Sequence, residues 1–203
     1  MELLIEPYYR KKSCIIDIDK SFTKSFDYEV AYNDTYCFKV GFNLYSTDEN
    51  YEDKQDIVAT VEGQIFKYNR IDEYNIDIVD LADNVSNDVF KAIQTLADNN
   101  LFTDIDIEYM PLVCYLSRLY IYPKYRGNGI ATYIYKNLQE IFEYVTSDLT
   151  SIFITIPCPQ EPISEGKWEN VRDNNMFKSM VKLLEKHDFK SVGDEGFYYK
   201  SYT

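Results

Sequence analysis

Residues 119–131 read Leu-Tyr-Ile-Tyr-Pro-Lys-Tyr-Arg-Gly-Asn-Gly-Ile-Ala, and they join two strong secondary-structure signals. The apolar run 109–122 is long enough for a central buried strand, which Pro123 ends because proline cannot donate to a sheet ladder. After the glycines, apolar side chains recur every three or four residues from Ile130 to Val145, which predicts a helix of about five turns. The sequence therefore predicts a buried strand, a glycine turn and a long helix in direct succession.

The glycine turn has the features of a diphosphate site. Gly127 and Gly129 allow the backbone to turn sharply and to approach a ligand closely. The first turn of the helix that follows leaves about four N–H groups without intrahelical partners, and the helix dipole favours anions there. Arg126 adds a planar cation for the same phosphates. We therefore predict a diphosphate on the amides of residues 127–132.

Three other interpretations of the turn fit less well. A P-loop needs Gly-Lys-Ser/Thr, whereas the chain has Gly129-Ile130-Ala131. A dinucleotide fingerprint needs a glycine where Thr132 stands. A glycine turn without a ligand leaves the arginine, the proline and the order of strand, turn and helix as coincidences.

The stretch closely resembles the (Arg/Gln)-x-x-Gly-x-(Gly/Ala) loop of the GNAT superfamily of N-acetyltransferases, with its preceding strand and proline. The resemblance covers residues 109–203 well and residues 1–108 loosely. It implies an α/β (α+β) fold with a mixed, mostly antiparallel central sheet flanked by helices. It also implies one GNAT-like domain over residues 1–203, with an acidic, partly helical insertion at about residues 67–108.

The resemblance implies acetyl-CoA as co-substrate, with its pyrophosphate on residues 127–132 and its pantetheine arm pairing like a strand with residues 119–121. Backbone N–H groups near Ile121 would then stabilise the oxyanion. The residues expected to bind acetyl-CoA are Leu119, Tyr120, Ile121, Arg126, Gly127, Asn128, Gly129, Ile130, Ala131 and Thr132.

No catalytic residue is assigned from the sequence. Many relatives have a tyrosine five residues before the aromatic of a Gly-Phe pair, as general acid toward the leaving thiolate. In this chain the pair is Asp188-Phe189, and Leu184 stands in the place of the tyrosine. His187 is interpreted as a residue near a helix C-cap. Trp168 is left as either a substrate contact or a cover for the core.

The acidic charge is concentrated in the middle of the chain. The 203 residues carry a net charge of −13, and residues 48–108 hold 16 acidic and 4 basic residues. This surface would repel a phosphate backbone, so direct nucleic-acid binding is not expected, whereas a small-molecule amine or a basic protein would be attracted. A solvated face that aids solubility is the other interpretation.

Cysteine and histidine supply argue against metal chemistry. The chain has four cysteines, no CxxC motif and one histidine, so no metal site is expected. The first residues, 1–7, lack a signal-peptide pattern, and no apolar stretch approaches the roughly 20 residues of a membrane span. A cytoplasmic protein without a membrane partner is the expectation.

Two functions remain open. The first is acetyl transfer from acetyl-CoA to a cationic amine. The second is a catalytically weak or inactive binding protein of the same fold, a phage-encoded acidic inhibitor that docks on a basic host protein such as a transcription factor subunit. The abundance of Ile, Asn, Lys, Tyr and Phe is typical of AT-rich genomes, such as those of phages and low-GC bacteria.

The rest of the chain gives weaker secondary-structure signals. The expected elements are strands at 14–18, 36–45, 57–66 and 151–156, a helix over 86–98 capped by Ser86 or Asn87, a polar link over 160–173, a helix capped by Asn174 or Asn175, and a closing hairpin of 189–192 with 197–202.

Overall fold

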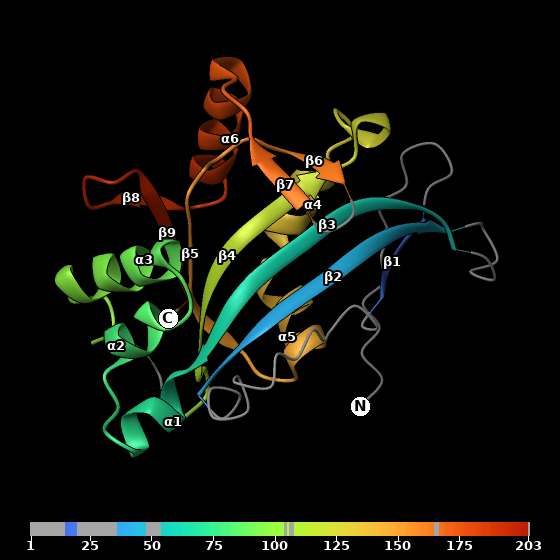
Figure 1. Cartoon of the computed structure of the whole chain (residues 1–203). Helices are drawn as coiled ribbons and strands as arrows, with labels where there is room; N and C mark the ends of the chain where they lie inside the picture. Colours follow the sequence, from blue (N-terminus) through green and yellow to red (C-terminus); the bar gives the residue numbers. More distant parts are fainter. Residues whose placement is uncertain are drawn as a thin grey trace.

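A computed structural model of the chain describes residues 15–19, 36–47, 54–103, 105, 108–164 and 167–202. The described residues form a seven-stranded sheet in the order β1-β2-β3-β4-β5-β9-β8, with helices packed on it (Figure 1). Its strands are β1 (Ile15–Asp19), β2 (Cys37–Thr47), β3 (Lys54–Lys67), β4 (Leu112–Ile121), β5 (Thr150–Thr155), β8 (Lys190–Val192) and β9 (Phe197–Ser201). Strands β4 and β5 are parallel and every other neighbouring pair is antiparallel. The predicted α+β class, with a mixed and mostly antiparallel sheet flanked by helices, is confirmed.

Strand β4 lies in the middle of the sheet, and both of its faces are covered. Leu112, Cys114 and Leu116 belong to a hydrophobic cluster shared with helices α4 (Ile130–Lys136), α5 (Leu138–Thr146) and α6 (Asn174–Lys186). Val113 and Tyr115, which alternate with them, belong to a second cluster shared with α1 (Tyr68–Glu73), α2 (Ile78–Asp83) and α3 (Asn87–Asp98). A strand buried on both faces needs a continuous apolar run, which explains the sequence of β4.

Helices α1, α2 and α3 all lie within the segment 67–108. The prediction of α3 is confirmed, and Ser86 caps it by accepting a hydrogen bond from Val89 N at 3.3 Å. Helices α1 and α2 are six residues each and were not predicted, because a single turn or two shows too little periodicity.

The long helix predicted after the glycine turn is divided at Asn137 into α4 and α5. The side-chain amide of Asn137 donates to Tyr133 O at 2.9 Å, the carbonyl that its own backbone N–H also reaches at 3.1 Å. Such local side-chain bonding competes with regular helix geometry. The two helices still present one apolar face, through Ile130, Ile134, Leu138 and Ile141.

The segment 160–173 contains a hairpin and is not the link that was predicted. Strands β6 (Gln160–Ser164) and β7 (Lys167–Asn170) pair antiparallel and pack beside β4 at its C-terminal end (Figure 1). The cap of α6 is also shifted from the prediction, since Asp173 accepts from Asn175 N at 2.8 Å and Met176 N at 2.9 Å.

The remaining boundaries differ from the predicted ones by a few residues at each end, and the closing hairpin forms from β8 and β9. Residue 14 of the first predicted strand, and residues 1–7 with their absent signal-peptide pattern, lie outside the described residues. None of the helices in the described ranges is long and apolar enough to cross a membrane.

Candidate functional site

The site begins where the parallel strands β4 and β5 separate. Their pairing runs from Leu112 and Thr150 to Tyr115 and Ile154. Thr155 Oγ1 then donates to Leu116 O at 2.8 Å, and beyond this contact β4 continues to Ile121 while β5 ends. A cavity of about 450 Å³ opens between the two strands. It leaves the β5-facing edge of residues 117–121 beside an open space.

The glycine turn closes one end of this cavity. The 3₁₀ helix η4 (Pro123–Tyr125) follows β4, and Gly127 (φ 74°) and Gly129 (φ 81°) both have left-handed backbone geometry before α4 begins. A Cβ placed on Gly127 would meet nothing within 4 Å, so the space beside that residue is open. Both glycines are needed for backbone conformation, because left-handed φ values strain other residues.

The structure brings the predicted acetyl-CoA residues together. Nine of the ten line the cavity: Leu119, Tyr120, Ile121, Arg126, Gly127, Gly129, Ile130, Ala131 and Thr132. The tenth, Asn128, is not among the lining residues, and its side-chain amide donates to Tyr125 O at 3.2 Å. Asn128 therefore shapes the turn from within.

Arg126 is already engaged by a carboxylate. Its Nη2 lies 2.8 Å from Glu161 Oε1 on the β6–β7 hairpin, and its Nε donates to Ile121 O at 2.9 Å. Tyr120 OH donates to the other oxygen of Glu161 at 2.6 Å. Burial and this hydrogen bond raise the pKa of Tyr120 to about 12, whereas the hydrogen bond from Tyr120 and the charge of Arg126 lower the pKa of Glu161. A phosphate on the turn would have to share Arg126 with Glu161.

Trp168 of β7 packs against the same strand. Its ring centroid lies 4.9 Å from that of Tyr120, and the guanidinium carbon of Arg118 lies 4.1 Å from its ring centroid. Trp168 thus joins the hairpin to β4 at the border of the cavity. It is not among the residues that line the cavity, which leaves a substrate contact a prediction.

A β-bulge distorts β4 beside the cavity. Glu62 pairs with Arg118 and Gly63 pairs with Leu116, so Ser117 is the extra residue. A Cβ on Gly63 would lie 3.0 Å from a backbone oxygen of β4, which explains the glycine at this close approach. Bulges interrupt the ladder and redirect side chains, and they are common next to active sites.

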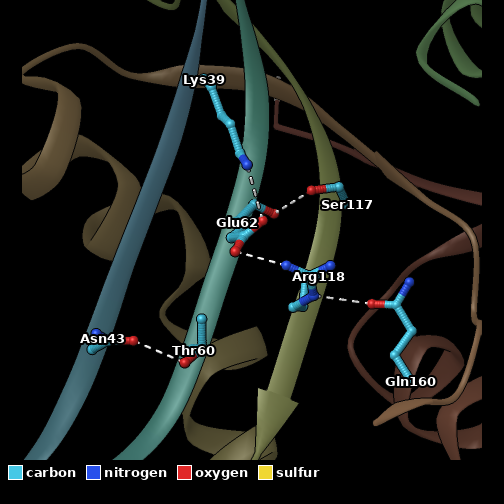
Figure 2. Close-up of polar contacts among 7 residues, drawn as sticks. All are labelled: Lys39, Asn43, Thr60, Glu62, Ser117, Arg118 and Gln160. Carbon is cyan, nitrogen blue, oxygen red and sulfur yellow. Dashed lines mark hydrogen bonds and ion pairs between the residues drawn. The ribbon is translucent and has the colours of Figure 1, made fainter. Parts of the chain in front are cut away.

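A row of ionic contacts crosses the sheet at the bulge (Figure 2). Glu62 contacts Lys39 Nζ at 3.3 Å and Arg118 Nη1 at 2.7 Å, one with each carboxylate oxygen. Arg118 Nε also donates to Gln160 Oε1 at 3.0 Å, and Ser117 Oγ donates to the backbone oxygen of Glu62 at 3.1 Å (Figure 2). Arg118 is therefore held by Glu62 of β3 and by Gln160 and Trp168 of the β6–β7 hairpin.

A second cavity of about 700 Å³ lies against this row and against the N-terminal turn of α3. It borders the first cavity at Ser117, Arg118, Ile156, Cys158 and Gln160, which line both. The molecule therefore offers two adjoining spaces, one on each side of these shared residues.

Asp88 of α3 lines the second cavity and is exposed. No hydrogen bond or ion pair to its carboxylate is found in the described ranges. Burial raises the pKa of Tyr115 to about 12, with a further contribution from Asp88, and burial together with Asp88 raises the pKa of the Cys158 thiol. The Asp88 carboxylate is thus close enough to both groups to influence them.

A tyrosine of α4, and not the residue at position 184, is the candidate proton donor of the first cavity. Leu184 is only 1% exposed and lines the first cavity together with Tyr135 of α4. The Tyr135 side chain is 6% exposed, its hydroxyl has no hydrogen-bond partner in the described part of the chain, and burial raises its pKa well above the ordinary value. His187 and Glu108 line neither cavity, and Glu108 is exposed.

Sequence reasoning missed Glu161, Tyr135 and Asp88. Glu161 lies in a polar segment without periodicity, so no local signal marks it. Tyr135 follows Ile134 of the predicted apolar face and would have been found only by asking which tyrosines border the turn. Asp88 is two residues after the cap Ser86, where an acid is also explained by the helix dipole.

Comparison of the chain with models of known protein families gives no match, and comparison with curated proteins gives none either. No group of three or more His, Cys, Asp or Glu side chains that could hold a metal ion occurs among residues with a described placement.

Proposed function

We propose that this chain is an N-acetyltransferase of GNAT-like fold, which transfers the acetyl group of acetyl-CoA to a cationic amine. The observation that carries the proposal is the cavity between the separating strands β4 and β5, closed at one end by the glycine turn. Ligands of α/β proteins commonly bind at such breaks in a sheet.

The residues present fit acetyl-CoA. The open space beside Gly127 and the left-handed Gly129 leave a cradle without side chains at the start of α4, as a diphosphate requires. The edge of residues 119–121 is not paired with β5 and can accept an extended amide-containing chain through backbone hydrogen bonds, with Ile121 O already bonded to Arg126 Nε. Met176 and Met180 of α6 give the opposite wall an apolar surface for that chain.

When bound, acetyl-CoA supplies the acyl group: the amine nitrogen bonds to the thioester carbon, the C–S bond breaks, and its electron pair leaves with the sulfur. The backbone N–H groups of β4 near Ile121 would donate to the thioester oxygen as it gains charge. Tyr135 would donate a hydrogen bond to the leaving sulfur in place of the tyrosine that Leu184 replaces. The acceptor ammonium loses one proton to solvent before attack, the nitrogen loses a second proton to solvent as the tetrahedral adduct collapses, and the leaving thiolate takes a proton from solvent.

The acceptor would enter from the second cavity, because that cavity meets the first at Ser117 and Cys158. The acids of residues 48–108 would attract the ammonium group of the acceptor. This arrangement keeps the two substrates on opposite sides of the bulge in β4.

Acetyl transfer can be monitored by measuring the free thiol that acetyl-CoA releases in the presence of each of a panel of amines. Binding of acetyl-CoA is measured separately by thermal shift. We expect acetyl-CoA at about 100 times its Kd to add roughly 2.7 kcal/mol of stability. Gly129→Val should abolish this shift. Gly196→Val is the matched control, since Gly196 (φ 83°) has similar backbone geometry but lines neither cavity. No shift in the wild-type protein would contradict the proposal.

The second candidate function, a non-catalytic acidic binding protein, is favoured by Leu184 and by the exposed acids of α1 and α2, Asp72, Glu73, Asp80 and Asp83. It predicts no thermal shift with acetyl-CoA and no thiol release with any amine. The same pair of measurements therefore separates the two functions.

A further inference from the structure

We propose that the acceptor is a free α-amino acid with an apolar side chain, bound in the second cavity by its ammonium group at Asp88 and by its carboxylate at Lys39 and Arg118. The inference rests on the proposed function, which places an amine acceptor in this cavity, and it names the class of amine. It follows from three properties of the cavity.

Part of the lining of the second cavity carries an excess of positive charge. Lys39 and Arg118 both line it and share a single carboxylate, that of Glu62. Arg118 is fixed from the side by Gln160, and Trp168 lies against its guanidinium plane. With Nη1 on Glu62 and Nε on Gln160, the pre-oriented guanidinium presents Nη2 to a carboxylate, beside the Lys39 ammonium.

The same cavity is also lined by an acid whose charge no ion pair compensates among the described residues. Asp88 has no ion-pair partner in the described part of the chain, whereas the other acid lining the cavity, Glu195, is paired with Lys91 at 3.3 Å. Asp88 and Cys158 both line the second cavity, and Cys158 also lines the first. An ammonium held by Asp88 would therefore lie beside the cleft that is proposed to hold the acetyl donor.

The second cavity is partly apolar. Val85, Ile156 and Phe197 line it, and Ile156 is 37% exposed, which is high for an isoleucine. A ligand side chain that covers Ile156 would remove apolar surface from water.

Other amine classes fit the cavity less well. A polyamine would place a second cation against Lys39 and Arg118, and a ligand with two carboxylates would place one against Asp88. Like charges held together in this way oppose binding. A ligand with one charge of each sign can satisfy Asp88 as well as Lys39 and Arg118.

Direct binding tests the inference without the coenzyme. The apolar amino acids Val, Leu, Ile, Met and Phe are titrated by ligand-observed NMR, and the tightest binder is compared with its amide, its decarboxylated amine and its deaminated acid. We expect the amino acid to bind at least about tenfold more tightly than each of the three.

Variants of the protein test which side chains bind the carboxylate and the ammonium group of the amino acid. Lys39→Met should weaken binding of the amino acid but not of the decarboxylated amine, and Asp88→Asn should weaken both of these but not the deaminated acid. Asp83→Asn is the control, because Asp83 is an exposed acid of α2 that lines neither cavity. Circular dichroism melts confirm that each variant folds.

These titrations test the class of acceptor and not the binding of acetyl-CoA. Equal affinity for the amino acid, its amide and its amine would overturn it, as would failure of all five amino acids to bind. Because these titrations contain no acetyl-CoA, a protein that binds amino acids but does not bind acetyl-CoA would instead overturn the proposed function.

Discussion

Glu161→Gln should strengthen the binding of acetyl-CoA. In the wild-type protein the Glu161 carboxylate holds Arg126 at 2.8 Å and accepts from Tyr120 at 2.6 Å. The side-chain amide that the substitution introduces can still accept from Tyr120 through its oxygen, but it has no charge with which to hold Arg126. The guanidinium would then be free to turn toward a diphosphate on the glycine turn, and a negative charge would be removed from beside that diphosphate.

The expected gain in acetyl-CoA affinity follows from the solvent exposure of the Arg126–Glu161 pair. The Arg126 and Glu161 side chains are 36% and 33% exposed, so solvent screens their attraction, and such pairs are worth at most about 1 kcal/mol. Releasing Arg126 should therefore tighten acetyl-CoA by about two- to fivefold. The gain should shrink as salt is raised.

Isothermal titration of acetyl-CoA into the wild-type protein, Glu161→Gln, Arg126→Ala and the double variant measures the effect as a thermodynamic cycle. We expect Arg126→Ala to weaken binding and to remove most of the gain from Glu161→Gln. If Glu161→Gln instead weakens binding, Glu161 positions Arg126 for the phosphates and the inferred competition is wrong.

Three further predictions concern catalysis, the core and pH. Tyr135→Phe should remove the hydrogen bond to the leaving sulfur, about 1.5–3 kcal/mol, and so lower kcat for thiol release by roughly 10- to 10²-fold with little change in KM, whereas Tyr133→Phe on the same helix should not. Phe142→Ala should cost about 3–5 kcal/mol in urea unfolding, because the ring packs at 5.6 Å and 5.0 Å, centroid to centroid, against Phe42 of β2 and Phe153 of β5. Burial, then Lys186 and Lys200, lower the pKa of His187, so its neutral form is favoured by folding. Stability should therefore be lost as pH falls below about 6.5 and through the lower folded pKa, and His187→Phe, which keeps the ring packing on Tyr135, should reduce that loss in urea melts at pH 5.5 and 7.5.

The strand, turn and helix around Gly127 and Gly129 could be predicted from the sequence because each has a strong local signal. β4 is a continuous apolar run, proline ends it, and the apolar face after the turn has helical spacing. The cap at Ser86 was predictable for the same reason, since capping depends on residues within one turn.

The parts that were missed depend on contacts between distant residues. The break at Asn137 comes from a side chain that competes with the helix, which spacing alone does not reveal. The β6–β7 hairpin is stabilised by Trp168 and Glu161 packing on Tyr120, about 40 residues earlier in the chain. The pairing of Arg126 with Glu161 also depends on distant residues, so the sequence predicted only that Arg126 binds the phosphates.

The adjoining cavities were also beyond sequence reasoning, because they arise from the separation of β4 and β5 and from a bulge at Ser117. Asp88, Lys39 and Arg118 come from three separate elements, and only the folded sheet brings them to one space. The charge count of residues 48–108 indicated a cationic ligand but could not show the positive charges that face it.

Hydrogen exchange of the protein with and without acetyl-CoA tests where the coenzyme binds. We predict slower exchange at the amides of residues 117–121 and 127–132 when acetyl-CoA is present, and little change in the exposed helices α1 and α2. Protection confined to other segments, or no protection at saturating acetyl-CoA, would contradict the assignment of the β4–β5 cleft as the acetyl-CoA site.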